Sequence, residues 1–160
     1  MPVDNASDCP VGISGCPVGL IIRPAVAAVV RDAHGRILLH RRRVGGGWAP
    51  PSGSLEPGEG IHSGLLRELY EETGLTADIE RLIGVYSDPA YQIVQYPDGR
   101  VIQFVTCLFS CRLRVGNLQG SDEGMAWAWF APDTLPEDLT AYARVWLQDA
   151  LSDTTQVVVR

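Results

Sequence analysis

Lysine is missing from this sequence of 160 residues: all thirteen basic side chains are arginine, and the net charge is −6. A protein that binds duplex nucleic acid without sequence preference needs a basic stripe that displaces counterions from the phosphates. The acidic balance therefore argues against duplex nucleic acid as a partner. Small phosphorylated ligands remain compatible with it, because a few local arginines are enough to bind them.

Long apolar runs are missing as well. The best candidate, residues 18–30, is interrupted by Arg23 and Pro24 and is shorter than the ~20 apolar residues that span a bilayer. Asp4 and Asp8 precede the first arginine, which reverses the charge order of a secretory signal. We therefore expect a soluble, cytoplasmic protein without a membrane partner.

Cysteine is sparse. Its four positions are Cys9, Cys16, Cys107 and Cys111, and neither pair has the C-x-x-C spacing of many zinc and redox sites. In a cytosolic chain we expect free thiols. A zinc site or a disulfide is the alternative that the sequence leaves open.

The length fits one domain that buries its own core. Residues 1–19 are small, polar and rich in turn-forming residues, so we expect a flexible N-terminal segment there. The domain itself is expected over residues 20–160.

Hydrophobic periodicity predicts a mixed β-sheet between α-helices, an α/β fold. Two strands, 24–31 and 36–42, flank a turn that contains His34. A helix is expected between Gly60, an acceptable N-cap, and Gly74, which suits a left-handed C-terminal cap. The other expected elements are strands at 78–86, 91–96, 101–113 and 125–130, and a closing helix at 139–151 with Tyr142 and Trp146 on its apolar stripe.

The helix after Gly60 carries an unusual acidic face. Glu68, Glu71 and Glu72 stand at positions i, i+3 and i+4, so their side chains project in similar directions. Ile61, Leu65 and Leu69 fall in nearly the same sector, which places the carboxylates beside the buried stripe and not opposite it. Carboxylate oxygens without clustered histidine or cysteine suit a hard cation, Mg²⁺ or Mn²⁺. A solvated acidic face is the alternative reading.

The spacing around this helix is specific. From Gly53 to Leu75 the chain reads GSLEPGEGIHSGLLRELYEETGL, with Gly53, Glu59, Arg67-Glu68, Glu71-Glu72 and Gly74 at fixed intervals. This segment resembles the signature of the Nudix hydrolases at every fixed position. The resemblance implies the Nudix fold, a mixed sheet sandwiched between helices.

The resemblance also implies roles for the residues of the segment. Glu68, Glu71 and Glu72, together with the backbone carbonyl of Ser52, would bind the metal. The family more often has glycine where this chain has Ser52. Arg67 would orient the carboxylates as a bidentate partner, and Glu59 would complete that network.

The implied reaction is attack of water on a phosphorus atom of a diphosphate bridge, with divalent metal ions clamping the phosphate oxygens and activating the water. Glu68, Glu72 and Arg67 would form the core of the catalytic site. In related enzymes a glutamate in a loop after the sheet often binds metal or acts as the base, and Glu123 lies in a comparable segment. Asp122 is the alternative base.

Substrate contacts are predicted from residues outside the segment. Arg41 and Arg43 are expected to reach phosphate. They belong to a run of three arginines with Arg42, and the alternative is that at least one of the three only faces solvent. Tyr86 and Phe104 are expected to stack on a base, although aromatic residues on strands more often belong to the core. Further candidates of the same kinds are Tyr91, Trp127, Gln92, Gln95 and Gln103.

The leading hypothesis is a metal-dependent hydrolase of a nucleoside diphosphate linked to another group, which includes nucleotide sugars, ADP-ribose and nucleoside triphosphates. A non-catalytic nucleotide sensor of the same fold is the alternative, although such proteins can lose the carboxylates that this chain keeps. RNA cap removal is a third reading, which the acidic balance disfavours except for short RNA ends. A homodimer is also open, since small Nudix enzymes are often dimers.

Overall fold

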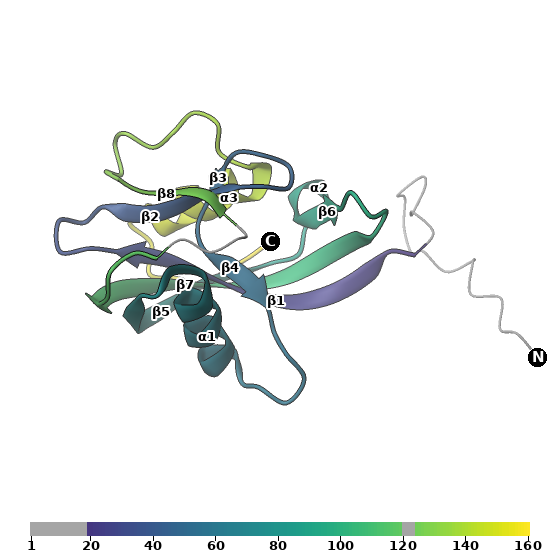
Figure 1. Cartoon of the computed structure of the whole chain (residues 1–160), viewed down its shortest axis with the longest axis horizontal. Coiled ribbons are helices and arrows are strands. Elements are labelled where there is room, and N and C mark those ends of the chain that lie inside the picture. Colours follow the sequence, from purple (N-terminus) through teal and green to yellow (C-terminus); the bar gives the residue numbers. More distant parts are fainter. Residues whose placement is uncertain (1–18, 120–123) are drawn as a thin grey trace, which may run out of the picture.

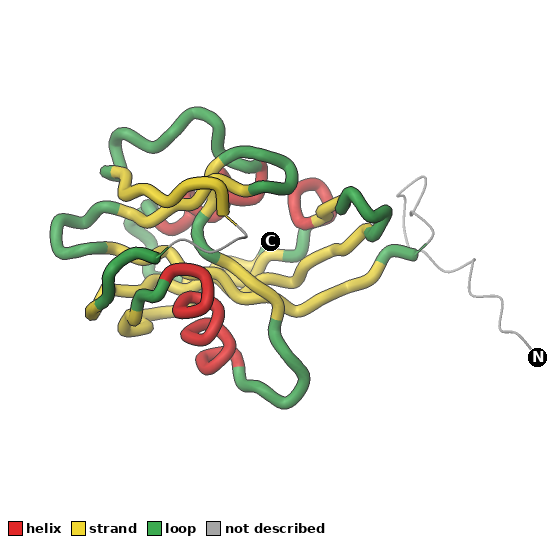
Figure 2. Tube along the Cα trace, in the orientation of Figure 1, coloured by secondary structure: helices red, strands yellow, loops and turns green. Residues whose placement is uncertain are grey.

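The computed structural model describes residues 19–119 and 124–160, and Figures 1 and 2 show a central sheet with helices on either side of it. The elements in chain order are β1 (Ile21–Arg31), β2 (Ile37–Arg42), β3 (Trp48–Ala49), β4 (Ser52–Ser54), α1 (Ile61–Thr73), β5 (Thr76–Tyr86), α2 (Pro89–Gln92), β6 (Ile93–Gln95), β7 (Val101–Val115), β8 (Gly124–Phe130), α3 (Ala141–Ala150) and β9 (Val158–Val159).

The sheet is mixed and is built around β1 and β7. Its strand order is β3-β2-β1-β7-β5-β9, with β4 paired to β1, β6 to β7 and β8 to β2. Strands β1 and β7 run parallel from the pair Ile21–Ile102 to the pair Arg31–Arg112, whereas β5 and β7 are antiparallel. The short strand β4 leads directly into the loop before α1, so it places that loop beside the centre of the sheet.

Each face of the sheet has its own core, because successive residues of β1 point to opposite sides. Val26, Ala28 and Val30 pack with Leu65 and Leu69 of α1. Ala27 and Val29 pack on the other face, with Trp146, Leu147 and Ala150 of α3. Helices α1 and α3 therefore cover opposite faces (Figure 1), and the predicted sandwich is confirmed.

Local signals in the sequence account for most element boundaries. Strands β1 and β2 form the predicted hairpin, with His34 in its turn. Helix α1 begins after Gly60 and ends at Gly74, whose φ of 70° is left-handed and whose backbone N–H donates to the Tyr70 carbonyl oxygen at 2.8 Å.

Two details of the prediction are wrong. The expected strand at 91–96 begins with the end of helix α2, because the Asp88 side chain accepts a hydrogen bond from the Ala90 N–H and Pro89 occupies the first helical turn. Ile61, expected on the buried stripe of α1, is 42% exposed because it stands at the first position of the helix.

Some predictions fall outside the described residues. These are the flexible segment up to residue 18, the thiols of Cys9 and Cys16, and the candidate bases Asp122 and Glu123. Within the described chain, Cys107 and Cys111 are free cysteines, and burial raises the pKa of Cys111 to about 12. None of the helices in the described ranges is long and apolar enough to cross a bilayer.

Candidate active site

The acidic face of α1 borders the core, as the helical spacing predicts. Leu65 and Leu69 are each 2% exposed, and Glu72 is only 3% exposed. The side chain of Glu68 is 18% exposed, whereas that of Glu71 is 58% exposed. The three carboxylates thus run from the protein interior to the solvent along one side of the helix.

Arg67 connects four acceptors. Its Nε and Nη2 donate to the two carboxylate oxygens of Glu59 at 3.0 and 2.7 Å. Its Nη1 donates to Glu68 at 3.0 Å and to Glu71 at 2.9 Å, and Nη2 also reaches the Ser54 carbonyl oxygen at 3.2 Å. The bidentate pair is with Glu59, not with a carboxylate of the helix, and it ties the helix to the loop that precedes it.

Glu59 remains ionised over a wide pH range. Hydrogen bonds from Arg67, followed by the backbone N–H of Glu56, lower the pKa of Glu59 to about 2. The same contacts raise the pKa of Arg67 further above its ordinary value, with the Glu59 hydrogen bond as the largest cause. The pair therefore stays fully charged at any pH near neutrality.

Gly53 allows Glu68 to press against the backbone of β4. A Cβ atom at position 53 would lie 2.0 Å from Glu68 Cδ and 2.1 and 2.5 Å from its two carboxylate oxygens. A side chain at this position would displace the Glu68 carboxyl group. The requirement for glycine at this position is therefore steric. The missing side chain lets the Glu68 carboxylate lie against Gly53, the residue next to Ser52.

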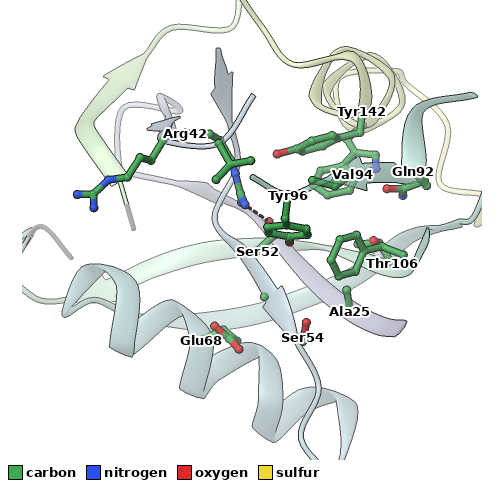
Figure 3. Close-up of a pocket in the computed structure, with 15 residues that line it drawn as sticks. Ala25, Arg42, Ser52, Ser54, Glu68, Gln92, Val94, Tyr96, Thr106 and Tyr142 are labelled. Atoms are coloured by element: carbon green, nitrogen blue, oxygen red, sulfur yellow. Dashed lines mark hydrogen bonds between the residues drawn. The ribbon is translucent and has the colours of Figure 1, made fainter. Parts of the chain in front are cut away.

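The Glu68 carboxylate lies at one end of a cavity of about 510 Å³. The cavity extends from α1 and β4 towards β6, β7 and α3, with Glu68 at the opposite side of the drawn residues from Gln92 and Tyr142 (Figure 3). Its lining comprises Ala25, Arg42, Arg43, Val44, Ser52, Gly53, Ser54, Glu68, Gln92, Val94, Tyr96, Phe104, Thr106, Tyr142 and Trp146.

The two ends of the cavity differ in chemistry. Near β4 the lining carries Glu68, Ser52 and Arg42, whose Nη1 donates to Ser52 Oγ at 3.5 Å. The side towards α3 is aromatic: the rings of Tyr142 and Trp146 have centroids 4.7 Å apart. Phe104 and Tyr96 add two more rings to the lining of the cavity. The cavity thus joins a charged end to an end that can stack a flat ring.

Five residues selected from the sequence line this cavity: Arg43, Ser52, Glu68, Phe104 and, from the further candidates, Gln92. Arg41 does not line it. The Arg41 guanidinium lies 3.2 Å from the Asp138 carboxylate, and both side chains are about half exposed. Arg42, which the sequence analysis grouped with its neighbours without selecting it, is the arginine next to Ser52.

Tyr86 requires a correction. Its side chain is fully buried in the core under α3, and its hydroxyl donates to Asp149 at 3.0 Å. A ring enclosed in this way presents no face to a ligand, so the expectation that Tyr86 stacks on a base is wrong. Burial, followed by the hydrogen bond to Asp149, raises the pKa of this phenol.

Sequence reasoning did not select Tyr96, Thr106, Tyr142 or Trp146, all of which line the cavity. Tyr142 and Trp146 were assigned only to the buried stripe of the closing helix. The available signal was that both rings lie one helical turn apart on the same face. Nothing in the local sequence shows that this face meets β6 and β7.

A divalent cation fits the chemistry of the acidic face. The donors are carboxylate oxygens and a backbone carbonyl beside Gly53, which are ligands that Mg²⁺ and Mn²⁺ prefer. Over residues 19–119 and 124–160, no three Asp, Glu, His or Cys side chains converge closely enough to enclose a metal ion. In this arrangement Arg67 bridges Glu68 and Glu71, so the metal ligands stay a prediction.

The fold and the motif place the chain in one family. Residues 21–150 match the model of the NUDIX domain, and the chain therefore belongs to the NUDIX domain family. The predicted Nudix fold and the predicted class, a hydrolase that acts on pyrophosphate bonds, are both confirmed.

Relatives of the chain carry the names of different proteins. The chain is 34% identical over 127 residues to a MutT-like protein of Streptomyces ambofaciens, covering 79% of this chain and 75% of that protein. It is 34% identical over 122 residues to an ADP-ribose pyrophosphatase of Methanocaldococcus jannaschii, covering 74% and 68%. It is 27% identical over 143 residues to an RNA pyrophosphohydrolase of Novosphingobium aromaticivorans, covering 79% and 88%.

A solved structure supports the fold. The crystal structure of the MutT protein from Methanosarcina mazei Go1 superimposes with a TM-score of 0.67 and 24% identity, covering 82% of this chain and 94% of that one.

Proposed function

We propose that this protein uses Mg²⁺ or Mn²⁺ to hydrolyse the diphosphate linkage of a nucleoside diphosphate joined to another group. The observation that carries this proposal is the Glu68 carboxylate. It is pressed against β4 by the missing side chain of Gly53, at the charged end of a cavity whose other end is aromatic.

Each part of the cavity has a role in this reaction. Glu68, Glu71, Glu72 and the Ser52 carbonyl would hold the cation, which, when bound, polarises the phosphate and activates water. Arg67 orients Glu68 and Glu71 through the hydrogen bonds described above. Arg42 and Arg43 bind phosphate oxygens, while Phe104 and Tyr142 stack on the base.

The oxygen of water bonds to phosphorus as a water O–H bond breaks and its proton passes to the base. The bond between that phosphorus and the bridging oxygen breaks, the bridging oxygen leaves with the other phosphate, and the products are a nucleoside monophosphate and a phosphorylated remainder. The base that accepts the proton from water is proposed to be Glu123, with Asp122 as the alternative.

The test is product release from a panel of ADP-ribose, nucleotide sugars, dinucleoside polyphosphates and triphosphates, with and without Mg²⁺ or Mn²⁺. Glu72→Gln should abolish metal-dependent turnover while the circular dichroism spectrum is unchanged. Glu137→Gln, at an exposed position outside the cavity, is the matched control and should behave like the wild type. Unchanged turnover in Glu72→Gln would contradict the metal assignment.

Two other functions have distinct outcomes in the same panel. Tight nucleotide binding without any turnover would indicate a nucleotide sensor. The relative named RNA pyrophosphohydrolase favours adding short RNAs with a 5′-triphosphate, and release of pyrophosphate from them in preference to small nucleotides would indicate that activity. The cytoplasmic location and the homodimer remain predictions.

A further inference from the structure

A second cavity, of about 530 Å³, lies beside the first. It is lined by the turn Gly45–Gly46–Gly47 between β2 and β3, by α2 and β6, and by the segment that enters α3. All three glycines have positive φ angles of 64° to 79°, and a Cβ atom at Gly45 or Gly46 would have no neighbour within 4 Å. The turn therefore encloses the space with backbone and leaves it open to a ligand.

The two cavities are joined. Arg42, Val44, Val94 and Tyr142 line both of them, and Figure 3 shows Arg42, Val94 and Tyr142 around the upper part of the first cavity. Arg42 is the only cation among these four shared residues, and its Nη1 lies 3.5 Å from Ser52 Oγ. A planar guanidinium at a junction next to the predicted metal site is well placed to hold a phosphate bridge.

The lining of the second cavity does not suit additional phosphate. Arg42 is its only basic residue, and the Asp138 carboxylate, together with Gln95 and Thr140, contributes polar groups. A terminal phosphate placed there would meet the Asp138 carboxylate and would have to compete with it for Arg41, which already pairs with Asp138 at 3.2 Å. A carboxylate, an amide and backbone groups instead match the hydroxyl groups of a sugar.

We propose that the second cavity binds a sugar attached to the far phosphate, so that the substrate carries an organic group at each end of its diphosphate. This proposal rests on the proposed hydrolase function. In this arrangement the diphosphate bridge lies at Arg42, the nucleoside occupies the first cavity, and the sugar occupies the second cavity. The substrate class is then the nucleoside diphosphate sugars, ADP-ribose included, and not the nucleoside triphosphates.

The test compares two pairs of substrates whose members share a base and differ only beyond the second phosphate: ADP-ribose against ATP, and UDP-glucose against UTP. Two variants fill the second cavity from exposed positions, Ala141→Trp at the start of α3 and Ala90→Trp on α2. Gln148→Trp is the matched control, because it adds the same ring to an exposed position of α3 outside both linings.

The wild type should hydrolyse the sugar-linked member of a pair with the higher kcat/KM. Ala141→Trp and Ala90→Trp should lower that kcat/KM by about tenfold or more, the usual effect of losing one contact in a specificity pocket, and change the triphosphate value less than twofold. Gln148→Trp should change neither. Preference for the triphosphate, or an equal loss for both members in the two cavity variants, would overturn the proposal.

Absence of metal-dependent turnover for every pair and for every other substrate of the panel would instead refute the proposed hydrolase. The second cavity is then assayed by calorimetric binding of ADP-ribose and ADP. Weaker binding of ADP-ribose to Ala141→Trp, with unchanged binding of ADP, would support the sugar site, and equal changes for both ligands would overturn it.

Discussion

Replacing Gly53 with alanine should separate catalysis from stability. In the present structure the added Cβ atom would lie 2.0 Å from Glu68 Cδ, whereas ordinary Cβ contacts begin near 3.4 Å. The Glu68 carboxyl group must then move by about 1.4 Å, the difference between these two distances. A displacement of about 1 Å at a reacting centre costs on the order of 10²-fold in rate, so we expect kcat to fall about 100-fold.

The stability of the variant should change little. Gly53 does not have a positive φ, and the group that must move is the end of a flexible side chain and not backbone. Alanine also restricts the unfolded chain, which offsets part of any strain. We expect the free energy of unfolding to change by about 1 kcal/mol or less.

The assay is steady-state hydrolysis of the best substrate from the panel, combined with urea unfolding. Gly60→Ala is the matched control, because its φ is −82° and the nearest atom to an added Cβ is Ser63 Oγ at 3.6 Å. It should keep its activity within twofold. Wild-type kcat in Gly53→Ala, with Glu68→Gln inactive, would refute the steric argument.

Three further predictions follow from named contacts. Arg67→Lys replaces a planar fork of five N–H donors with an ammonium group that has three and cannot form the bidentate pair with Glu59, so kcat should fall at least about tenfold; unchanged kinetics would contradict the positioning role. Tyr86→Phe should lower the free energy of unfolding by about 1 kcal/mol without altering KM, whereas a raised KM would return Tyr86 to the binding site. Burial, with a smaller effect of Arg42, lowers the pKa of His40 to about 3. In the unfolded chain the pKa of His40 is near 6.5, so between pH 3 and pH 6.5 the unfolded chain binds more protons than the folded protein. Urea unfolding should therefore show a free energy of unfolding that falls below pH 6.5 by up to about 1.4 kcal/mol per pH unit. An equally steep fall in His40→Leu would show that His40 is not the cause.

The sequence predicts best what depends on neighbouring residues. The spacing from Gly53 to Leu75 identified helix α1, its two glycine ends and the pairing of Arg67 with Glu59, because all of these lie within one loop and one helix. Helix α2 was missed although its signal was local: Asp88 followed by Pro89 is a recognisable helix start.

The remainder of the site depends on contacts between distant segments. Tyr96, Tyr142 and Phe104 reach one cavity only because β6, β7 and α3 meet there, and no local pattern encodes that meeting. Strand alternation likewise does not state which face of the sheet lies under a helix. Tyr86 was therefore a reasonable candidate for ligand binding, and only the packing of α3 shows that its ring is enclosed.

Arg67 also bears on how the protein folds. Three carboxylates, Glu59, Glu68 and Glu71, surround one guanidinium, which acts as an internal counterion for an acidic segment that would otherwise repel itself. The helix can therefore form and pack before any cation arrives. Unlike small zinc domains, whose folding depends on their metal, this chain is expected to stay folded after chelation and to regain activity when the cation is restored.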